Sequence, residues 1–337
     1  MEKIRIGQIG IRHEHASGIM QSLRLLPEIF EIVGVVDDRH SQSAAFPNAS
    51  LAIYEGLPWL SEEKLLNTPG LQAVCVETAN LDLVPTALRC LEKSVAIHMD
   101  KPGGDDLALF RKLREGCEQR GLPFQIGYMF RSNPAMLWTR NAVKQGLIGD
   151  LFEIQTGMSH CYGGDAYQDY LGKFQGGIMF NLGCHLIDLV ISLLGCPQNV
   201  TPILKSTPGL PNPISNNALA ILEYPHAIVN IQACSKEVNG LEKRKLKICG
   251  TKGSVELSPL ECFDGRSLKL QLHLAESTPC FPAGPQILDF GVIRDRYRDH
   301  LLEFAKIIRG EIPNPYNATH DCLVQEILLA AAGCRCP

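Results

Sequence analysis

Residues 3–15 read KIRIGQIGIRHEH, and this stretch decides the fold of the first part of the chain. An apolar run covers residues 4–9 and ends at Gly10, and a helical pattern of apolar residues follows from about residue 15 to residue 26. A buried strand, a glycine turn and a helix in this order begin the βαβ unit that binds dinucleotides. The stretch therefore predicts the first strand, turn and helix of a Rossmann domain.

The turn departs from the glycine pattern GxGxxG that such domains carry. Only Gly10 is present, and Arg12 and His15 stand where the other two glycines belong. A side chain at the second position obstructs the approach of the backbone to a pyrophosphate. Arg12 is a candidate to compensate, because its guanidinium can donate to phosphate oxygens, and His13 is a further candidate contact. The alternative is a surface arginine in a turn that binds nothing.

The run His13-Glu14-His15 also raises the question of a metal ion, since imidazole and carboxylate are zinc ligands. We expect no metal here, because two histidines that lie two residues apart at the start of a helix diverge. Cys334 and Cys336 are too few thiolates for a closed site. The sequence therefore predicts no metal centre.

A second apolar run covers residues 31–36 and ends in Asp37 and Asp38. Asp37 lies 27 residues after Gly10, close to the spacing at which an acidic residue binds the adenosine ribose. A carboxylate there accepts hydrogen bonds from the ribose hydroxyls and repels a 2′-phosphate. We expect NAD rather than NADP, although a solvated aspartate at a strand end remains the alternative.

Further buried runs alternate with helical patterns in the first third of the chain. The runs cover residues 71–76, 95–98 and 123–126, and the helical patterns cover residues 83–92 and 105–120. This alternation predicts an α/β domain with a doubly wound parallel sheet.

After residue 128 strand patterns dominate, which favours an α+β domain with a large, mostly antiparallel open sheet. They cover residues 152–161, 218–234, 245–249, 254–257 and 268–274, and residues 201–216 are expected to form a loop. We divide the chain into an NAD-binding domain (1–127), a substrate and oligomerisation domain (128–318), and a C-terminal helix and tail (319–337). The last part is expected to pack toward the first domain.

Composition narrows the class of protein. The 337 residues carry a formal net charge of −4 without a basic block, so a nucleic-acid partner is not expected. No apolar stretch is long enough to span a bilayer, and no signal peptide is evident. The 13 cysteines form no C-x-x-C pair and are expected to be reduced thiols, which indicates a cytoplasmic location.

Residues 180–194 form a predicted helix with one narrow polar stripe. Asn181, His185, Asp188 and Ser192 follow at spacings of four, three and four, which places them on one face. The other positions from residue 182 to residue 194 are apolar or small. Buried polar side chains need a partner or a ligand, so the stripe indicates a site, with a satisfied structural network as the alternative.

Oxidation of a secondary alcohol needs a base for the hydroxyl proton and positive charge for the developing alkoxide. His185 suits the first role, because an imidazole titrates near neutral pH. Lys101 suits the second, because it follows the fourth strand at the carboxyl edge where a doubly wound sheet places its ligand.

At Asp100-Lys101-Pro102 the chain resembles the Gfo/Idh/MocA oxidoreductases, a family that includes glucose–fructose oxidoreductase and inositol dehydrogenase. The resemblance extends over nearly the whole chain; its segments are residues 3–10, 31–37, 73–80, 98–102, 127–134, 176–188 and 250–253, with the two closing helices. It implies an NAD-dependent dehydrogenase that acts on a secondary hydroxyl of a sugar, sugar derivative or cyclitol. It also implies that Lys101 and His185 are catalytic and that Thr78, Asn80 and Asp100 lie beside the cofactor.

The chain departs from the family pattern at Leu83, where many members have histidine, and at Asn181, where aspartate is usual. Asn181 is a third candidate catalytic residue, because it can hydrogen-bond a substrate hydroxyl or orient His185. The candidate substrate-binding side chains are Tyr128, Arg131, His160, Tyr162, Asn181, His185 and Asp188.

Two other functions stay open at this point. One is an NAD-dependent glycoside-cleaving enzyme that works by transient oxidation and elimination. The other is a non-catalytic NAD-binding regulatory protein. As partners of the protein we expect a small carbohydrate-like substrate and further copies of the same chain. The homo-oligomer, a dimer or tetramer, is expected to use the outer face of the second sheet.

Overall fold

The computed structural model describes residues 2–43, 46, 51–162, 164–210 and 213–334, so Cys336 lies outside the described residues. The chain divides into two compact units, each described by itself. Unit 1 comprises Met1–Met129 and Tyr297–Gln325, and unit 2 comprises Phe130–Arg296 and Glu326–Pro337. The boundary falls inside α9 (Ala318–Ala331), the last helix of the chain.

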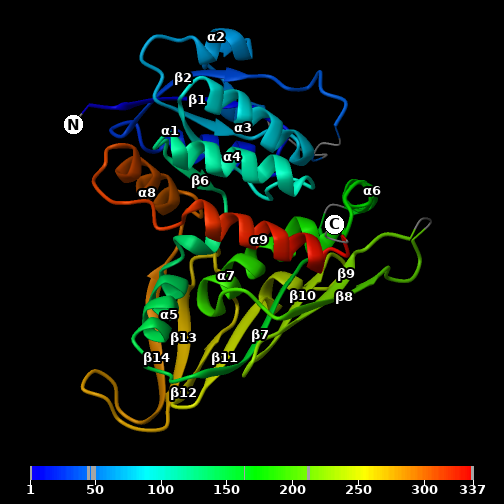
Figure 1. The fold of residues 1–337 in the computed structure, drawn as a ribbon, viewed down its shortest axis with the longest axis vertical. Coiled ribbons are helices and arrows are strands. Elements are labelled where there is room, and N and C mark those ends of the chain that lie inside the picture. The colour runs from blue at the N-terminus through cyan, green and yellow to red at the C-terminus, as the bar shows by residue number, and fades with distance from the viewer. Residues whose placement is uncertain (1, 44–45, 47–50, 163, 211–212, 335–337) are drawn as a thin grey trace. The chain divides into compact units, whose positions relative to one another are not determined.

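Unit 1 is built on a six-stranded sheet whose neighbouring strands are all parallel (Figure 1). Its strands in spatial order are β3 (Trp59–Leu60), β2 (Phe30–Val36), β1 (Ile4–Ile9), β4 (Ala73–Val76), β5 (Ala96–Met99) and β6 (Phe124–Ile126). This is the doubly wound order of a Rossmann domain, and it confirms the predicted fold class. Because the strand order reverses between β1 and β4, their carboxyl ends form the edge at which such a sheet binds its ligand.

Helices cover the sheet of unit 1 and close its core. They are α1 (Ala16–Arg24), α2 (Glu62–Leu66), α3 (Leu83–Glu92), α4 (Leu107–Gln119) and α8 (Arg298–Ile308). Leu23 of α1 and Phe304 of α8 lie in one buried cluster with Ile6 of β1. α8, which the sequence division grouped with the second domain, therefore packs in unit 1, because its apolar face completes the core over β1 and β4.

Unit 2 carries the eight-stranded sheet. Its strands in spatial order are β14 (Gly284–Val292), β13 (Ser267–Leu274), β12 (Gly253–Leu257), β11 (Lys245–Gly250), β7 (Leu151–Ser159), β10 (Ile228–Cys234), β9 (Asn217–Glu223) and β8 (Asn199–Lys205). Only β7 and β10 pair in parallel, with Ile231 beside Thr156, and the other neighbours are antiparallel. The mostly antiparallel sheet is as predicted.

Two strands of this sheet, β8 and β14, were not predicted. β8 occupies part of the expected loop at residues 201–216. It contains Pro202, and it can form a strand there because it lies at the edge of the sheet, where a proline is tolerated. The expected single strand over residues 218–234 is the hairpin β9–β10, which turns at residues 224–227.

The helices of unit 2 are α5 (Pro134–Lys144), α6 (Gly164–Leu171) and α7 (Cys184–Leu194). A π-helical turn, Met179–Gly183, leads directly into α7. α7 is buried from Cys184 to Ile191, so the polar side chains of His185 and Asp188 have no access to bulk water. α7 packs against α5 and β7 on one face of the sheet.

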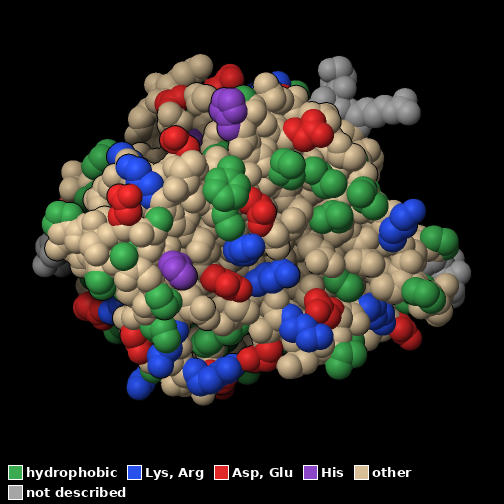
Figure 2. All heavy atoms as spheres, turned by 90° about the horizontal axis from the view of Figure 1, so that it is seen from below, with side chains coloured by type: hydrophobic (Ala, Val, Ile, Leu, Met, Phe, Trp, Pro, Cys, Tyr) green, Lys and Arg blue, Asp and Glu red, His purple; other side chains and the backbone are tan. Residues whose placement is uncertain are grey.

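No helix of the described residues is long and apolar enough to cross a membrane. On the face drawn in Figure 2, outside the grey atoms, basic and acidic side chains are interspersed with apolar ones, and neither sign forms a large patch. This distribution agrees with the small formal net charge of −4.

Candidate active site

The turn after β1 is shaped by Gly10, which has a φ of +95°. A Cβ at this position would lie 2.5 Å from the backbone nitrogen of Thr78, so β1 and the end of β4 approach too closely for any other residue. Asp38 fixes the next peptide, because its buried carboxylate accepts a hydrogen bond from the amide of Ile11 at 2.9 Å. Burial raises the pKa of Asp38, while this hydrogen bond and the charge of Arg12 oppose the shift.

Arg12 binds the loop that follows β2. Its guanidinium donates to the carbonyl oxygens of Asp38, Ser41 and Ser43, with distances of 2.9 Å to Ser41 and 2.6 Å to Ser43. The sequence suggested phosphate oxygens as its partners, whereas the structure gives it three backbone carbonyls. The reason is local, since the loop after β2 folds back over the turn and presents its carbonyl groups there.

A groove of about 560 Å³ lies at the carboxyl edge of unit 1, beside the ends of β1 and β2. Its lining includes Asp37, Thr78, Asp82 and Thr86. Asp37 is a strand-end carboxylate whose bidentate partner is the exposed Arg39, which holds its pKa below the usual range. In doubly wound domains an acidic residue at this strand end accepts hydrogen bonds from the adenosine ribose, and Asp37 occupies that position in the lining of the groove.

The amides of the turn itself are largely used within unit 1. Ile11 donates to Asp38, His13 to the carbonyl of Glu77, and His15 to Nδ1 of His13. Asn80 lies buried in the short helix Asn80–Asp82, next to the groove. The amide donors of this turn therefore differ from those of the usual glycine-rich loop, because contacts within unit 1 already use them.

Lys101 is fully buried, and its ammonium forms an ion pair with the carboxylate of Glu14. Burial alone would raise the pKa of Glu14, but the charges of Lys101, His15 and His13 and the hydrogen bond from Lys101 together outweigh it, and the pKa falls to about 2. The carboxylate of Glu14 thus lies against the ammonium of Lys101 just after the end of β5. Sequence reasoning did not single out this role of Glu14, because nothing in the chain marks two residues 87 positions apart as partners.

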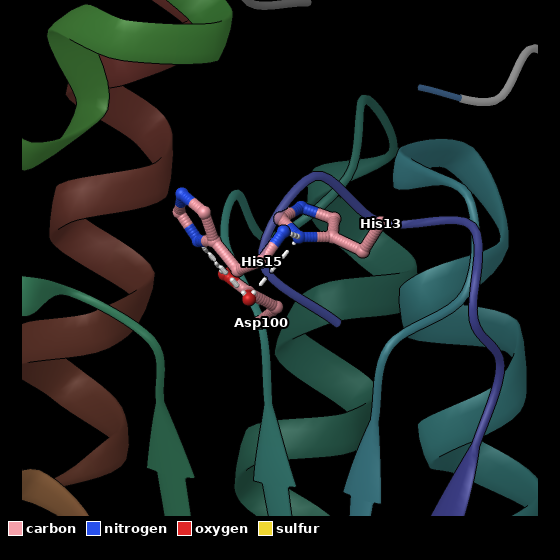
Figure 3. A group of neighbouring side chains, drawn as sticks. All are labelled: His13, His15 and Asp100. Atoms are coloured by element: carbon pink, nitrogen blue, oxygen red, sulfur yellow. Dashed lines mark hydrogen bonds and ion pairs between the residues drawn. The ribbon is translucent and has the colours of Figure 1, made fainter. Parts of the chain in front are cut away.

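His13, His15 and Asp100 converge in unit 1 (Figure 3). The two histidines were expected to diverge on a helix, but α1 begins only at Ala16, so both lie in the preceding turn. Nδ1 of His13 is 3.1 Å from Oδ2 of Asp100, and Nδ1 of His15 is 3.1 Å from Oδ1. The geometric reason for expecting no metal ion therefore fails.

In unit 2 the polar stripe on α7 divides between two networks. Asp188 forms a bidentate ion pair with Arg131, at 2.6 Å for the shortest contact, and both side chains are buried. Ser192 accepts from Arg140 at 2.9 Å. The two predicted substrate ligands Arg131 and Asp188 are therefore partners of each other.

Asn181 and His185 belong to a different environment. Asn181 lies in the π-helical turn and donates from Nδ2 to the hydroxyl of Tyr167 at 2.9 Å. Tyr167 in turn contacts His160, whose ring stacks on Tyr162 at a centroid distance of 3.6 Å. These aromatic rings form one group of neighbouring side chains, and Tyr162 is exposed.

His185 occupies the first turn of α7, immediately after the π-helical turn. It is fully buried, and its ring meets the edge of Phe130 at a centroid distance of 6.0 Å.

Tyr128, the remaining predicted ligand, is buried in unit 1. Tyr167 and Gln168 were missed by the sequence analysis. Gln168 accepts from Asn216 at 2.9 Å and from Ser235 at 3.1 Å.

Both halves of the chain match models of one family. Residues 4–128 match the oxidoreductase family with an NAD-binding Rossmann fold, and residues 136–256 match the GFO/IDH/MocA C-terminal domain. These matches cover most of the chain and confirm the resemblance seen in the sequence. The first of these models describes an NAD-binding Rossmann fold.

Individual relatives are distant. The chain is 24% identical to the uncharacterized oxidoreductase YhhX of Escherichia coli over 60% of this chain and 64% of that protein. It is 24% identical to the D-apiose dehydrogenase of Paraburkholderia graminis over 58% of this chain and 51% of that enzyme. The chain thus spans between about half and two thirds of the length of these relatives.

Among solved structures, the fold is similar to UDP-N-acetylglucosamine 3-dehydrogenase GnnA from Acidithiobacillus ferrooxidans. The TM-score is 0.78 at 17% identity, and the match covers 99% of this chain and 98% of that chain. At this identity the likeness establishes the fold.

We expect Gly10→Ala to destabilise the protein by roughly 3–5 kcal/mol, because a positive φ and a steric clash add together. Gly56→Ala is the matched control, since Gly56 has a φ of +77° but no atom within 4 Å of an added Cβ. The control should lose only about 1–2 kcal/mol. Urea unfolding measures both, and equal losses in the two variants would show that the close approach to Thr78 is not a constraint.

Proposed function

Since the chain belongs to the GFO/IDH/MocA oxidoreductase family, we propose that it is an NAD-dependent dehydrogenase acting on a secondary hydroxyl of a carbohydrate-like molecule. The observation that carries the proposal is the match of both halves of the chain to that family. The substrate class is supported by one relative named as a sugar dehydrogenase, the D-apiose dehydrogenase, and by the neighbouring aromatic rings of Tyr162 and Tyr167 in unit 2.

When bound, NAD supplies the acceptor for the hydride that leaves the alcohol carbon. The chain supplies the rest of the chemistry. His185 accepts the hydroxyl proton, and the oxygen becomes the carbonyl oxygen of the product as the hydride leaves. Asn181 positions a substrate hydroxyl through the amide that Tyr167 now engages.

Lys101 stabilises the negative charge that develops on the substrate oxygen. Its charge is available because Glu14 pairs with the ammonium inside the fold. Asp37 accepts from the adenosine ribose, and Thr78 and Asn80 lie at the adjoining edge of the groove. His13, Arg12, Asp38 and Asp100 hold the turn in shape around this binding edge.

We expect Asp37→Ala to weaken NAD binding by about tenfold or more, because a hydrogen bond to a charged group contributes roughly 1.5–3 kcal/mol. NADP should bind more tightly to the variant, because the change removes a negative charge and releases Arg39 toward a 2′-phosphate. Titration calorimetry with both cofactors measures the effect. The double change Asp37→Ala with Arg39→Ala separates the two causes. Tighter binding of NADP than NAD by the unaltered protein would contradict the proposal.

We expect His185→Ala to lower kcat by about 10²–10⁴-fold, because it removes the base. NAD affinity should stay unchanged, since His185 belongs to unit 2. His226→Ala, in the exposed turn between β9 and β10, is the control and should keep full activity. The assay follows NADH absorbance with a panel of sugars, sugar acids and inositols. Full activity of His185→Ala on a confirmed substrate would rule out this role.

The protein is expected to act in the cytoplasm, as its cysteine content suggests. We also propose a homo-oligomer that uses the outer face of the unit 2 sheet. Ile203, Leu219, Ile221 and Ile228 lie on that face of three neighbouring strands and are partly or largely exposed. These exposed apolar side chains would be buried if a second copy of the chain packed against this face.

Light scattering should give the mass of a dimer or tetramer, and Ile228→Glu should reduce that mass by placing a charge in the interface. Lys64→Glu, on an exposed position of α2 in unit 1, is the control. A monomer mass for the unaltered protein at micromolar concentration would exclude the oligomer.

A further inference from the structure

A cluster of donor atoms joins the turn after β1 to the end of β5. One nitrogen each of His13 and His15 and one carboxylate oxygen of Asp100 all lie within 4.8 Å of one another. Figure 3 shows both imidazole rings directed at the same carboxylate. All three residues are buried, so the cluster belongs to the interior of unit 1 and not to a solvated surface.

The contacts of His13 define its tautomer. Nε2 lies 2.9 Å from the carbonyl oxygen of Lys101, which can only accept, so Nε2 carries the hydrogen. Nδ1 accepts from the backbone amide of His15 at 3.2 Å. Nδ1 of the neutral ring therefore presents a lone pair, and that lone pair is 3.1 Å from Oδ2 of Asp100. With the hydrogen on Nε2, Nδ1 of His13 and Oδ2 of Asp100 are both acceptors, and a cation between them would satisfy both.

A second buried carboxyl group, Glu77, lies beside this pair. Its Oε2 is 3.9 Å from Nδ1 of His13, and the side chain is fully buried. Neither carboxyl oxygen of Glu77 accepts a hydrogen bond from a residue that the structure describes. Two buried carboxyl groups, Glu77 and Asp100, thus lie together beside the imidazole of His13, and a positive ion placed among them would offset the cost of their burial.

We propose that the turn binds one divalent transition-metal ion through Nδ1 of His13, Nδ1 of His15 and the carboxylate of Asp100, with Glu77 next to the fourth position. Zinc bonds of about 2.0–2.2 Å place tetrahedral ligand atoms roughly 3.3 Å apart, close to the spacing of each imidazole from the carboxylate. Two imidazoles select an ion of the zinc or cobalt class over calcium or magnesium.

The surroundings of the cluster suit such an ion. The carbonyl of Lys101 holds the ring of His13, and the amide of Lys101 donates to Oδ1 of Asp100 at 2.6 Å, so both ligands are oriented by outer contacts. The ammonium of Lys101 is balanced by Glu14. The ion would tie β1 to β5 where the usual glycines are missing, and no step of the proposed reaction passes through it.

The first experiment measures the metal content of the full chain, purified after growth with added zinc, by mass spectrometry of the elements. About one ion per chain is expected. After removal by a chelator, titration with cobalt chloride should produce the visible bands of tetrahedral cobalt at one equivalent. Thiolate charge-transfer bands in the near ultraviolet should be absent, since the ligands are nitrogen and oxygen.

The second experiment repeats the cobalt titration on His13→Asn and His15→Asn. Each change should weaken cobalt binding by at least about a hundredfold, because each removes a direct ligand and even outer contacts are worth 10–100-fold. His300→Asn is the matched control, since His300 is equally buried in unit 1 but lies outside the cluster, and it should bind like the unaltered protein. If a histidine variant does not fold, the cobalt spectrum of the unaltered protein still decides.

Three results would overturn the proposal. They are no cobalt binding at micromolar concentration, a spectrum with thiolate bands, and equal binding by the folded histidine variants, which would mean an adventitious ion only. Binding is measured without NAD or substrate, so the metal site and the dehydrogenase can fail separately. His185→Ala should bind cobalt normally even where it has lost turnover.

Discussion

Two buried carboxylates hold the turn between β1 and α1, and much of unit 1 depends on them. Asp38 reaches it from the end of β2 and accepts from Ile11, and Asp100 reaches it from the end of β5 and meets His13 and His15. In the usual dinucleotide turn, glycines leave room and free amides for phosphate. Here side chains fill that room, and the turn is held by polar contacts instead.

The side chains that stand in place of the usual glycines explain why the interior of unit 1 is polar at the carboxyl edge of its sheet. Glu14, Glu77, Asp100 and Lys101 are all buried or nearly so, together with the two histidines. Buried charges persist only in compensated groups, because an isolated charge loses its hydration. The ion pair of Lys101 with Glu14 provides one such compensation. It also keeps a positive charge at the edge where the sheet binds its ligand.

Unit 2 meets the same constraint in a different way. α7 is buried on all sides over its first two turns, so each polar side chain on it must find a partner. Arg131 supplies that partner for Asp188, and Arg140 supplies it for Ser192. The π-helical turn before α7 places Asn181 against Tyr167 of α6 instead. One stripe of the sequence thus serves both packing and the candidate site, and His185 lies between the two parts.

The sequence by itself determined the order and type of most elements and the family. Apolar runs end at Gly10, Asp37 and Asp100. Because buried strands that alternate with helices run parallel in one sheet, the carboxyl ends of these strands lie on the same edge. Edge strands such as β8 escaped prediction because their patterns are weak and a proline interrupts this one.

Only the tertiary structure decided which polar groups meet. Arg12 donates to backbone carbonyls, and Arg131 pairs with Asp188. His13 and His15 both contact Asp100. In each case the partner lies far away in the sequence. Sequence spacing predicts which side chains share a face of one element. It does not predict which side chain of another element lies opposite, because that is set by how sheets and helices pack.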